Sequence, residues 1–270
     1  MSGSRAYFLS TFLLINDRII VMSKLLSFVL LVFYSFSEAH SLPPYDGTIF
    51  HFKDAINSND STAFQQIVYL GQDNRTMFDR RKNDWIKNNA YLFNASYDDG
   101  LTIEIQVNSE FKDNKASDYA SQYAKVIGQL PTVLRKDIQT VWIHKGNKPF
   151  GGGNQNLLIH IIQGEKYISE GILEETLVHE ASHTSLDLDH GNAKGWRAAQ
   201  KVDDEFISAY AKDYPKREDI AESFLTWLVV RHLSDRVSES HIKKILKAIP
   251  NRIKYFDEQE FDMYPIVPRE

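Results

Sequence analysis

Apolar and polar residues alternate most regularly between residues 91 and 107. Leu101, Ile103, Ile105 and Val107 alternate with polar residues, and a second stretch, residues 91–97, precedes them across Asp98-Asp99-Gly100. A period of two is typical of a strand with one buried face. The pattern therefore predicts a β-hairpin formed by residues 91–97 and 101–107.

Two shorter apolar runs, residues 141–144 and 157–162, predict further strands. The glycines at 151–153 between them predict a flexible turn. Residues 117–130 carry apolar side chains at helical spacing, and Pro131 ends this predicted helix. From Gly171 onward the pattern is helical, over residues 172–186, 195–212, 215–233 and 239–248. The expected fold class is α+β, with a sheet-rich N-terminal half and a helical C-terminal half in a single domain spanning residues 40–270.

The N-terminal segment, residues 1–39, has the features of a secretory signal peptide. After Met22-Ser23-Lys24 comes an apolar run of 12 residues, 25–36, followed by Ser37-Glu38-Ala39. This run is too short to span a bilayer comfortably and ends in small residues. We expect cleavage near Ala39, with Met22 as an alternative start, so that the mature chain is secreted and keeps no stable membrane span. The alternative is an uncleaved N-terminal membrane anchor over residues 19–36.

The composition narrows the chemistry. The chain has 270 residues, 43% of them hydrophobic and 25% charged, and its formal net charge is −5. This balance is typical of a folded globular protein and offers no basic surface for phosphates, so nucleic acid is not an expected partner. The chain has no cysteine. Any bound metal must therefore be held by His, Asp or Glu.

The strongest chemical signal is His179-Glu180-Ala181-Ser182-His183. Histidines four residues apart leave the same face of a helix, so both imidazoles can bind one ion. Zinc accepts imidazole nitrogen and, in hydrolytic sites, keeps one position for water. Glu180 projects beside the pair, where it can reach that water without being a ligand.

This pattern resembles the zincin metallopeptidases, whose zinc helix carries His-Glu-x-x-His and usually follows a sheet with a substrate-binding edge strand. The resemblance implies a zincin-like fold, with residues 157–162 as that edge strand, His179 and His183 as zinc ligands and Glu180 as general base. On the predicted helix over residues 215–233, Glu222 shares an apolar stripe with Leu225, and a buried carboxylate needs a partner. A motif followed by a glutamate-bearing helix is similar to the gluzincin branch, in particular its bacterial toxin-type members, which makes Glu222 the expected third ligand.

Other residues remain open for the third position. Asp189 lies six residues after His183, where metzincin-like enzymes place a ligand, but Leu186 stands where their turn has glycine. His190 and Glu218 are further alternatives. Two tyrosines that precede Glu222, Tyr210 and Tyr214, are candidates for stabilising an oxyanion.

The expected function is that of a secreted zinc metallopeptidase, acting on a peptide or protein substrate through a zinc-bound water. Two alternatives are an inactive zinc-binding module and a zinc hydrolase of a non-peptide amide or ester. The sequence indicates no cleavage specificity and no oligomeric state.

Overall fold

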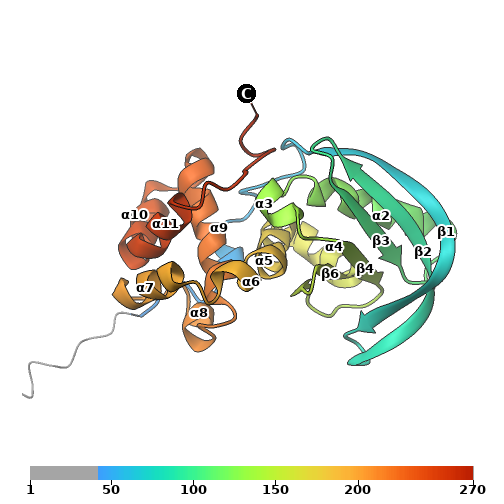
Figure 1. Ribbon diagram of the computed structural model, residues 1–270, viewed down its shortest axis with the longest axis horizontal. Coiled ribbons are helices and arrows are strands. Elements are labelled where there is room, and N and C mark those ends of the chain that lie inside the picture. Colours follow the sequence, from blue (N-terminus) through green and yellow to red (C-terminus); the bar gives the residue numbers. More distant parts are fainter. Residues whose placement is uncertain (1–41, 270) are drawn as a thin grey trace, which may run out of the picture. The chain divides into compact units, whose positions relative to one another are not determined.

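The computed structural model describes residues 42–269, so the predicted signal peptide lies outside the described residues. Within this range, no helix combines the length and the apolar character that crossing a bilayer requires. Figure 1 shows the strands gathered on one side and the helices of the C-terminal half on the other. This arrangement confirms the expected α+β class.

The strands are β1 (Phe64–Asp79), β2 (Asp84–Tyr97), β3 (Thr102–Val107), β4 (Thr140–His144), β5 (Gly151–Gly153) and β6 (Asn156–His160). The helices are α2 (Asp113–Ile127), α3 (Thr132–Arg135), α4 (Ile161–Glu170), α5 (Leu173–Ser185), α6 (Asp187–His190), α7 (Lys194–Val202), α8 (Ala209–Asp213), α9 (Asp219–His232), α10 (Glu239–Ala248) and α11 (Pro250–Asp257), with short 3₁₀ turns at Ile49–His51 and Ser234–Arg236.

One mixed sheet contains the strands in the order β1-β2-β3-β4-β6-β5. Strands β3, β4 and β6 run parallel, whereas β1, β2 and β5 are antiparallel to their neighbours. The predicted hairpin is confirmed, because β2 and β3 pair with Ala95 opposite Ile103. The two short strands at 141–144 and 157–162 are also confirmed as β4 and β6, although Ile161 and Ile162 already belong to α4.

Two predictions around the glycines were wrong: the flexible turn at residues 151–153, and the position of residues 157–162 as the edge strand. Residues 151–153 are a strand rather than a flexible turn, and the turn is made by Asn154 and Gln155, whose φ angles are 49° and 59°. Positive φ at two successive residues is typical of a tight hairpin turn. Because β5 pairs with β6 here, residues 156–160 have neighbours on both sides and β5 is the edge strand.

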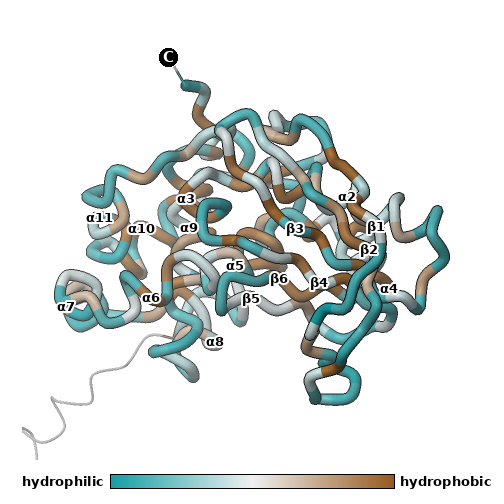
Figure 2. The backbone as a smooth tube through the Cα atoms, turned by 45° about the vertical axis from the view of Figure 1, so that its right-hand side comes forward, coloured by the Kyte–Doolittle hydropathy of each residue, from teal (hydrophilic) through white to brown (hydrophobic). Residues whose placement is uncertain are grey.

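One face of the sheet carries the main core. Alternate residues of the central strands, such as Ile105, Ile143 and Ile159, are buried on this face together with α2, α5 and α9. The opposite face has only a small buried cluster around Met77 and Leu92. In Figure 2 apolar segments run through β3, α5 and α9. The main core of the described residues therefore lies between the sheet and the helices on one of its sides.

Helix α5 is the central element of this core. It is buried around almost its whole circumference, which is the pattern of a helix enclosed by protein on every side. Its bounds match the predicted helix over 172–186 within one residue. The predicted helix at 195–212 is instead two helices, α7 and α8, because residues 203–208 interrupt it. Helix α9 begins only at Asp219, whereas the prediction began at Pro215.

Candidate metal centre

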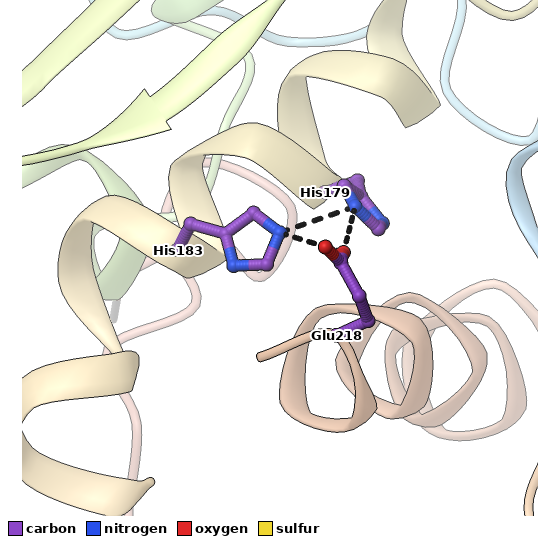
Figure 3. Close-up of side chains that lie close together, drawn as sticks. All are labelled: His179, His183 and Glu218. Atoms are coloured by element: carbon purple, nitrogen blue, oxygen red, sulfur yellow. Dashed lines mark hydrogen bonds and ion pairs between the residues drawn. The ribbon is translucent and has the colours of Figure 1, made fainter. Parts of the chain in front are cut away.

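Two histidines leave the same face of α5 and point toward the start of α9 (Figure 3). The Nε2 atoms of His179 and His183 lie 3.3 Å apart, and their rings are nearly perpendicular. His179 is 4% exposed, so its ring is almost completely shielded from solvent. The predicted convergence of the two imidazoles on one point is present in the structure.

The third group at this point is Glu218, the residue immediately before α9. Its Oε2 atom lies 3.4 Å from His179 Nε2 and 3.2 Å from His183 Nε2. A buried ion pair fixes the start of α9, because Arg252 Nε donates to Asp219 Oδ2 at 2.9 Å. The fixed start of α9 thereby places Glu218 beside the two rings.

The spacing of the three atoms suits a tetrahedral ion. Zinc bonds to nitrogen and oxygen of about 2.0–2.1 Å imply ligand atoms about 3.3 Å apart, since a tetrahedron's edge is about 1.6 times the distance from its centre to a corner. The three observed separations range from 3.2 to 3.4 Å. The spacing of His179, His183 and Glu218 therefore fits a divalent metal ion.

A second layer of carboxylates supports the imidazoles. Asp187 Oδ2 lies 2.9 Å from His183 Nδ1, and Glu222 Oε1 lies 3.3 Å from His179 Nδ1. A carboxylate beside the far nitrogen of a histidine helps to hold the ring and favours a proton on that nitrogen, so that Nε2 would be the nitrogen that binds a metal. Each histidine thus has one nitrogen at the candidate centre and the other against an acid.

Glu222, the expected third ligand, occupies this second layer. Its Oε1 faces the Nδ1 of His179 rather than the Nε2 atoms, and its Oε2 accepts a hydrogen bond from the Thr48 backbone N–H at 2.8 Å. The side chain is 2% exposed and has the predicted buried position with a partner. Because Glu218 rather than Glu222 joins the converging atoms, we replace Glu222 by Glu218 in the candidate ligand set.

The electrostatics of the site favour positive charge. Burial alone would lower the pKa of both histidines, but the carboxylates around them outweigh it and raise the pKa of His179 to about 10 and that of His183 to about 9. Burial would raise the pKa of Glu218, yet the two imidazoles that face it hold the pKa well below its usual range. A divalent cation would supply the charge that protons otherwise bring here.

The alternative ligands that follow α5 in the chain lie elsewhere. His190 Nδ1 is 2.7 Å from the hydroxyl of Tyr255, and Asp189 is exposed on α6. Neither belongs to the converging group of described residues. Leu186 has a φ of −112°, so the chain passes from α5 into α6 without a left-handed turn.

Glu180 lines two cavities that meet at the candidate centre. One has a volume of about 490 Å³ and is lined by the three candidate ligands and by all three residues of β5. The other, of about 390 Å³, has a more apolar lining that includes Ile49, Phe50 and Tyr167. The Glu180 carboxylate makes no hydrogen bond or ion pair with the residues that the structure describes, so it is available to a water or a substrate.

Strand β5 packs directly on the backbone of α5. A Cβ atom added at Gly152 would lie 1.7 Å from the carbonyl oxygen of Glu180, so only glycine allows this approach. Gly153 N–H donates to Thr184 Oγ1 at 2.9 Å, which joins the same two elements one residue later. The glycines therefore bring the sheet edge within reach of the candidate centre.

Of the two candidate tyrosines, Tyr210 is the one at the site. Its hydroxyl donates to Glu218 Oε1 at 2.9 Å, and the side chain lines both cavities. Arg217 Nε donates to the same Oε1 atom at 2.6 Å. Tyr214 lies beneath the guanidinium of Arg217 and lines neither cavity. Tyr210 thus orients Glu218 and can also reach a group bound beside it.

No known protein family, curated protein or solved structure gives a significant match to this chain.

Proposed function

We propose that this chain is a zinc-dependent hydrolase that cleaves peptide bonds. The observation that carries the proposal is the convergence of two imidazole nitrogens and one carboxylate oxygen at tetrahedral spacing, beside a cavity of about 490 Å³. Two histidines and one carboxylate, with one corner left for water, are typical of hydrolytic zinc sites. This support comes from the donor set and extends the resemblance seen in the motif.

When bound, zinc would supply a Lewis acid and lower the pKa of a water molecule. Glu180 takes the proton of the attacking water and returns it to the leaving amine, a role for which its unpaired carboxylate is suited. Asp187 and Glu222 keep the two imidazoles oriented. Tyr210 can donate its hydroxyl proton to the oxygen on which negative charge develops, if it leaves Glu218 in the complex.

The sheet edge favours a peptide as substrate. Strand β5 is the last strand of the sheet and lines the cavity that holds the candidate centre. An extended peptide can pair with such an edge through its backbone, which binds it without regard to most side chains. Because β5 has this edge, the substrate role expected for residues 157–162 passes to residues 151–153.

Glu180→Gln tests the proposal most directly. The amide cannot accept the proton, so we expect turnover of a peptide mixture to fall by at least about 10²-fold while bound zinc stays near one per chain. The measurements are elemental analysis of the purified chain and mass spectrometry of a random peptide digest, each with and without a chelator.

Two controls make this result specific. Glu165→Gln removes an exposed glutamate of α4, and His232→Asn removes a histidine at the far end of α9; both should retain zinc and turnover. By contrast, His179→Asn should lose the metal. A chain without stoichiometric zinc would refute the centre, and a zinc-loaded chain that cleaves no peptide would point to a binding module or to a non-peptide substrate.

A further inference from the structure

Arg80 lies where the turn between β1 and β2 meets the start of β5. Its Nη1 atom donates to the backbone carbonyl of Pro149 at 3.0 Å and to that of Phe150. A Cβ atom added at Gly151 would lie 2.4 Å from Arg80 Nη2, so the guanidinium is against the first residue of the strand. These contacts hold the group in one place at the wall of the large cavity.

The charge of Arg80 has no counter-ion among the described residues. Its hydrogen-bond partners are two neutral carbonyls, and no carboxylate within residues 42–269 pairs with it. The adjacent Arg81, in contrast, pairs with Asp79 at 2.8 Å and with Glu110 at 2.9 Å. Arg217, the other arginine of the cavity, is bound to Glu218. A half-buried guanidinium without an anion gains most from a ligand that brings one.

The donors that remain suit a carboxylate. The two hydrogen bonds of Arg80 use Nη1 alone, so Nε and Nη2 have no partner in the part of the chain that the structure describes. These two atoms form one edge of a planar fork that matches the two oxygens of a carboxylate. The position thus favours bidentate recognition of an acidic group.

Strand β5 relates Arg80 to the reacting bond. The backbone of Glu180, the residue that carries the proposed general base, packs against Gly152, whereas Arg80 packs against Gly151 and Phe150. Positions along a strand are about 3.3 Å apart, so the two contacts are offset by one or two residues, or about 3–7 Å. A peptide extended along β5 with its scissile bond at Glu180 would bring the side chain of a nearby residue to Arg80.

We propose that Arg80 selects substrates that carry a carboxylate within two residues of the cleaved bond. This inference depends on the proposed function for the position of the bond, but the recognition of an acidic peptide in the cavity is independent of turnover. The carboxylate is either an aspartate or glutamate side chain or the free C-terminus of a peptide.

The test uses binding, so that it does not require hydrolysis. Zinc-loaded Glu180→Gln protein is immobilised and exposed to random octapeptides, one set with free C-termini and one set amidated, and the bound peptides are sequenced by mass spectrometry. We expect acidic peptides to be enriched roughly 10- to 100-fold, as for one charge-assisted bidentate contact. Enrichment within the amidated set identifies a side-chain carboxylate, and enrichment confined to the free set identifies the C-terminus.

Arg80→Gln in the same background should abolish the enrichment, and Arg80→Lys should retain part of it, since a lysine keeps the charge without the fork. Lys82→Gln, at an exposed position of the same turn, is the matched control and should change nothing. Equal acidic enrichment with and without Arg80, or none in any variant, would overturn the inference. Hydrolysis by the wild-type chain without an acidic preference would spare the proposed function, whereas Arg80-dependent binding without hydrolysis would overturn the function alone.

Discussion

The assignment of the third ligand can be tested by comparing Glu218→Gln with Glu222→Gln. The two glutamates are one helical turn apart, and both contact His179, but at opposite nitrogens of its ring. Replacement by glutamine keeps the size of each side chain and removes its charge. The two variants therefore separate direct coordination from support of the ring.

The geometry implies different losses for the two variants. Binding of a structural zinc ion contributes about 10–16 kcal/mol, so each of three protein ligands accounts for about 3–5 kcal/mol, or about 10²- to 10⁴-fold in affinity. A carboxylate that only orients a histidine ligand contributes about 10- to 100-fold. We expect Glu218→Gln to weaken zinc binding about ten times more than Glu222→Gln.

The assay is competition with a chromophoric zinc chelator at fixed pH, with far-ultraviolet circular dichroism to show that each variant is folded. Fixed pH is required because protons compete with the metal for the two histidines. Asp189→Asn serves as the control, because Asp189 is exposed on α6 and should have no effect. A greater loss for Glu222→Gln than for Glu218→Gln would refute Glu218 as the third ligand.

Two further predictions concern the scaffold around the centre. Gly152→Ala should lower both the melting temperature and zinc affinity, because its Cβ would lie 1.7 Å from the carbonyl oxygen of Glu180, whereas Gly47→Ala, with its nearest neighbour at 3.9 Å, should have little effect on either. Burial raises the pKa of Glu175 from 4.5 to about 8, so the folded state favours the protonated carboxyl group. The stability linked to this proton is fully present below about pH 4.5, falls as the pH rises above 4.5, and is lost once the pH has passed 8. Glu175→Gln, which does not titrate, should therefore gain stability relative to wild type between pH 4.5 and 8, by at most ~5 kcal/mol in denaturant unfolding; a difference independent of pH would contradict this.

The parts of the fold that could be predicted are those with a regular local pattern. Helix α5 follows from its apolar residues, and the convergence of His179 and His183 follows from their spacing on that helix. The hairpin of β2 and β3 follows from strict alternation along residues 101–107. In each case a short continuous stretch of sequence contains the information that the prediction needs.

The third ligand could not be chosen from the sequence for a physical reason. Glu218 and Glu222 are four residues apart and point in similar directions, so spacing alone favours neither. The choice depends on where α9 begins and how it packs against α5, which places Glu218 at the Nε2 atoms. The signal that was present is the group of acidic residues Glu218, Asp219 and Glu222 at the start of a strongly apolar helix.

Strands β1 and β5 were missed because their formation depends on contacts distant in the sequence. Most residues of β1 are polar or exposed, so no alternation marks it, and it forms by pairing along almost the whole of β2. The glycines of β5 suggest flexibility in isolation. Their role becomes apparent only when Gly152 is placed against the backbone of α5.

The hydrogen bond from Thr48 to Glu222 joins positions 174 residues apart. Contacts of such long range close late in folding, since a large loop must first lose its conformational entropy. The same early segment also pairs at Tyr45 with Ser208, on the approach to α8. Completion of the candidate centre is thus coupled to docking of the segment around Tyr45 and Thr48, and a newly synthesised chain gains this support of His179 only when these two distant parts have met.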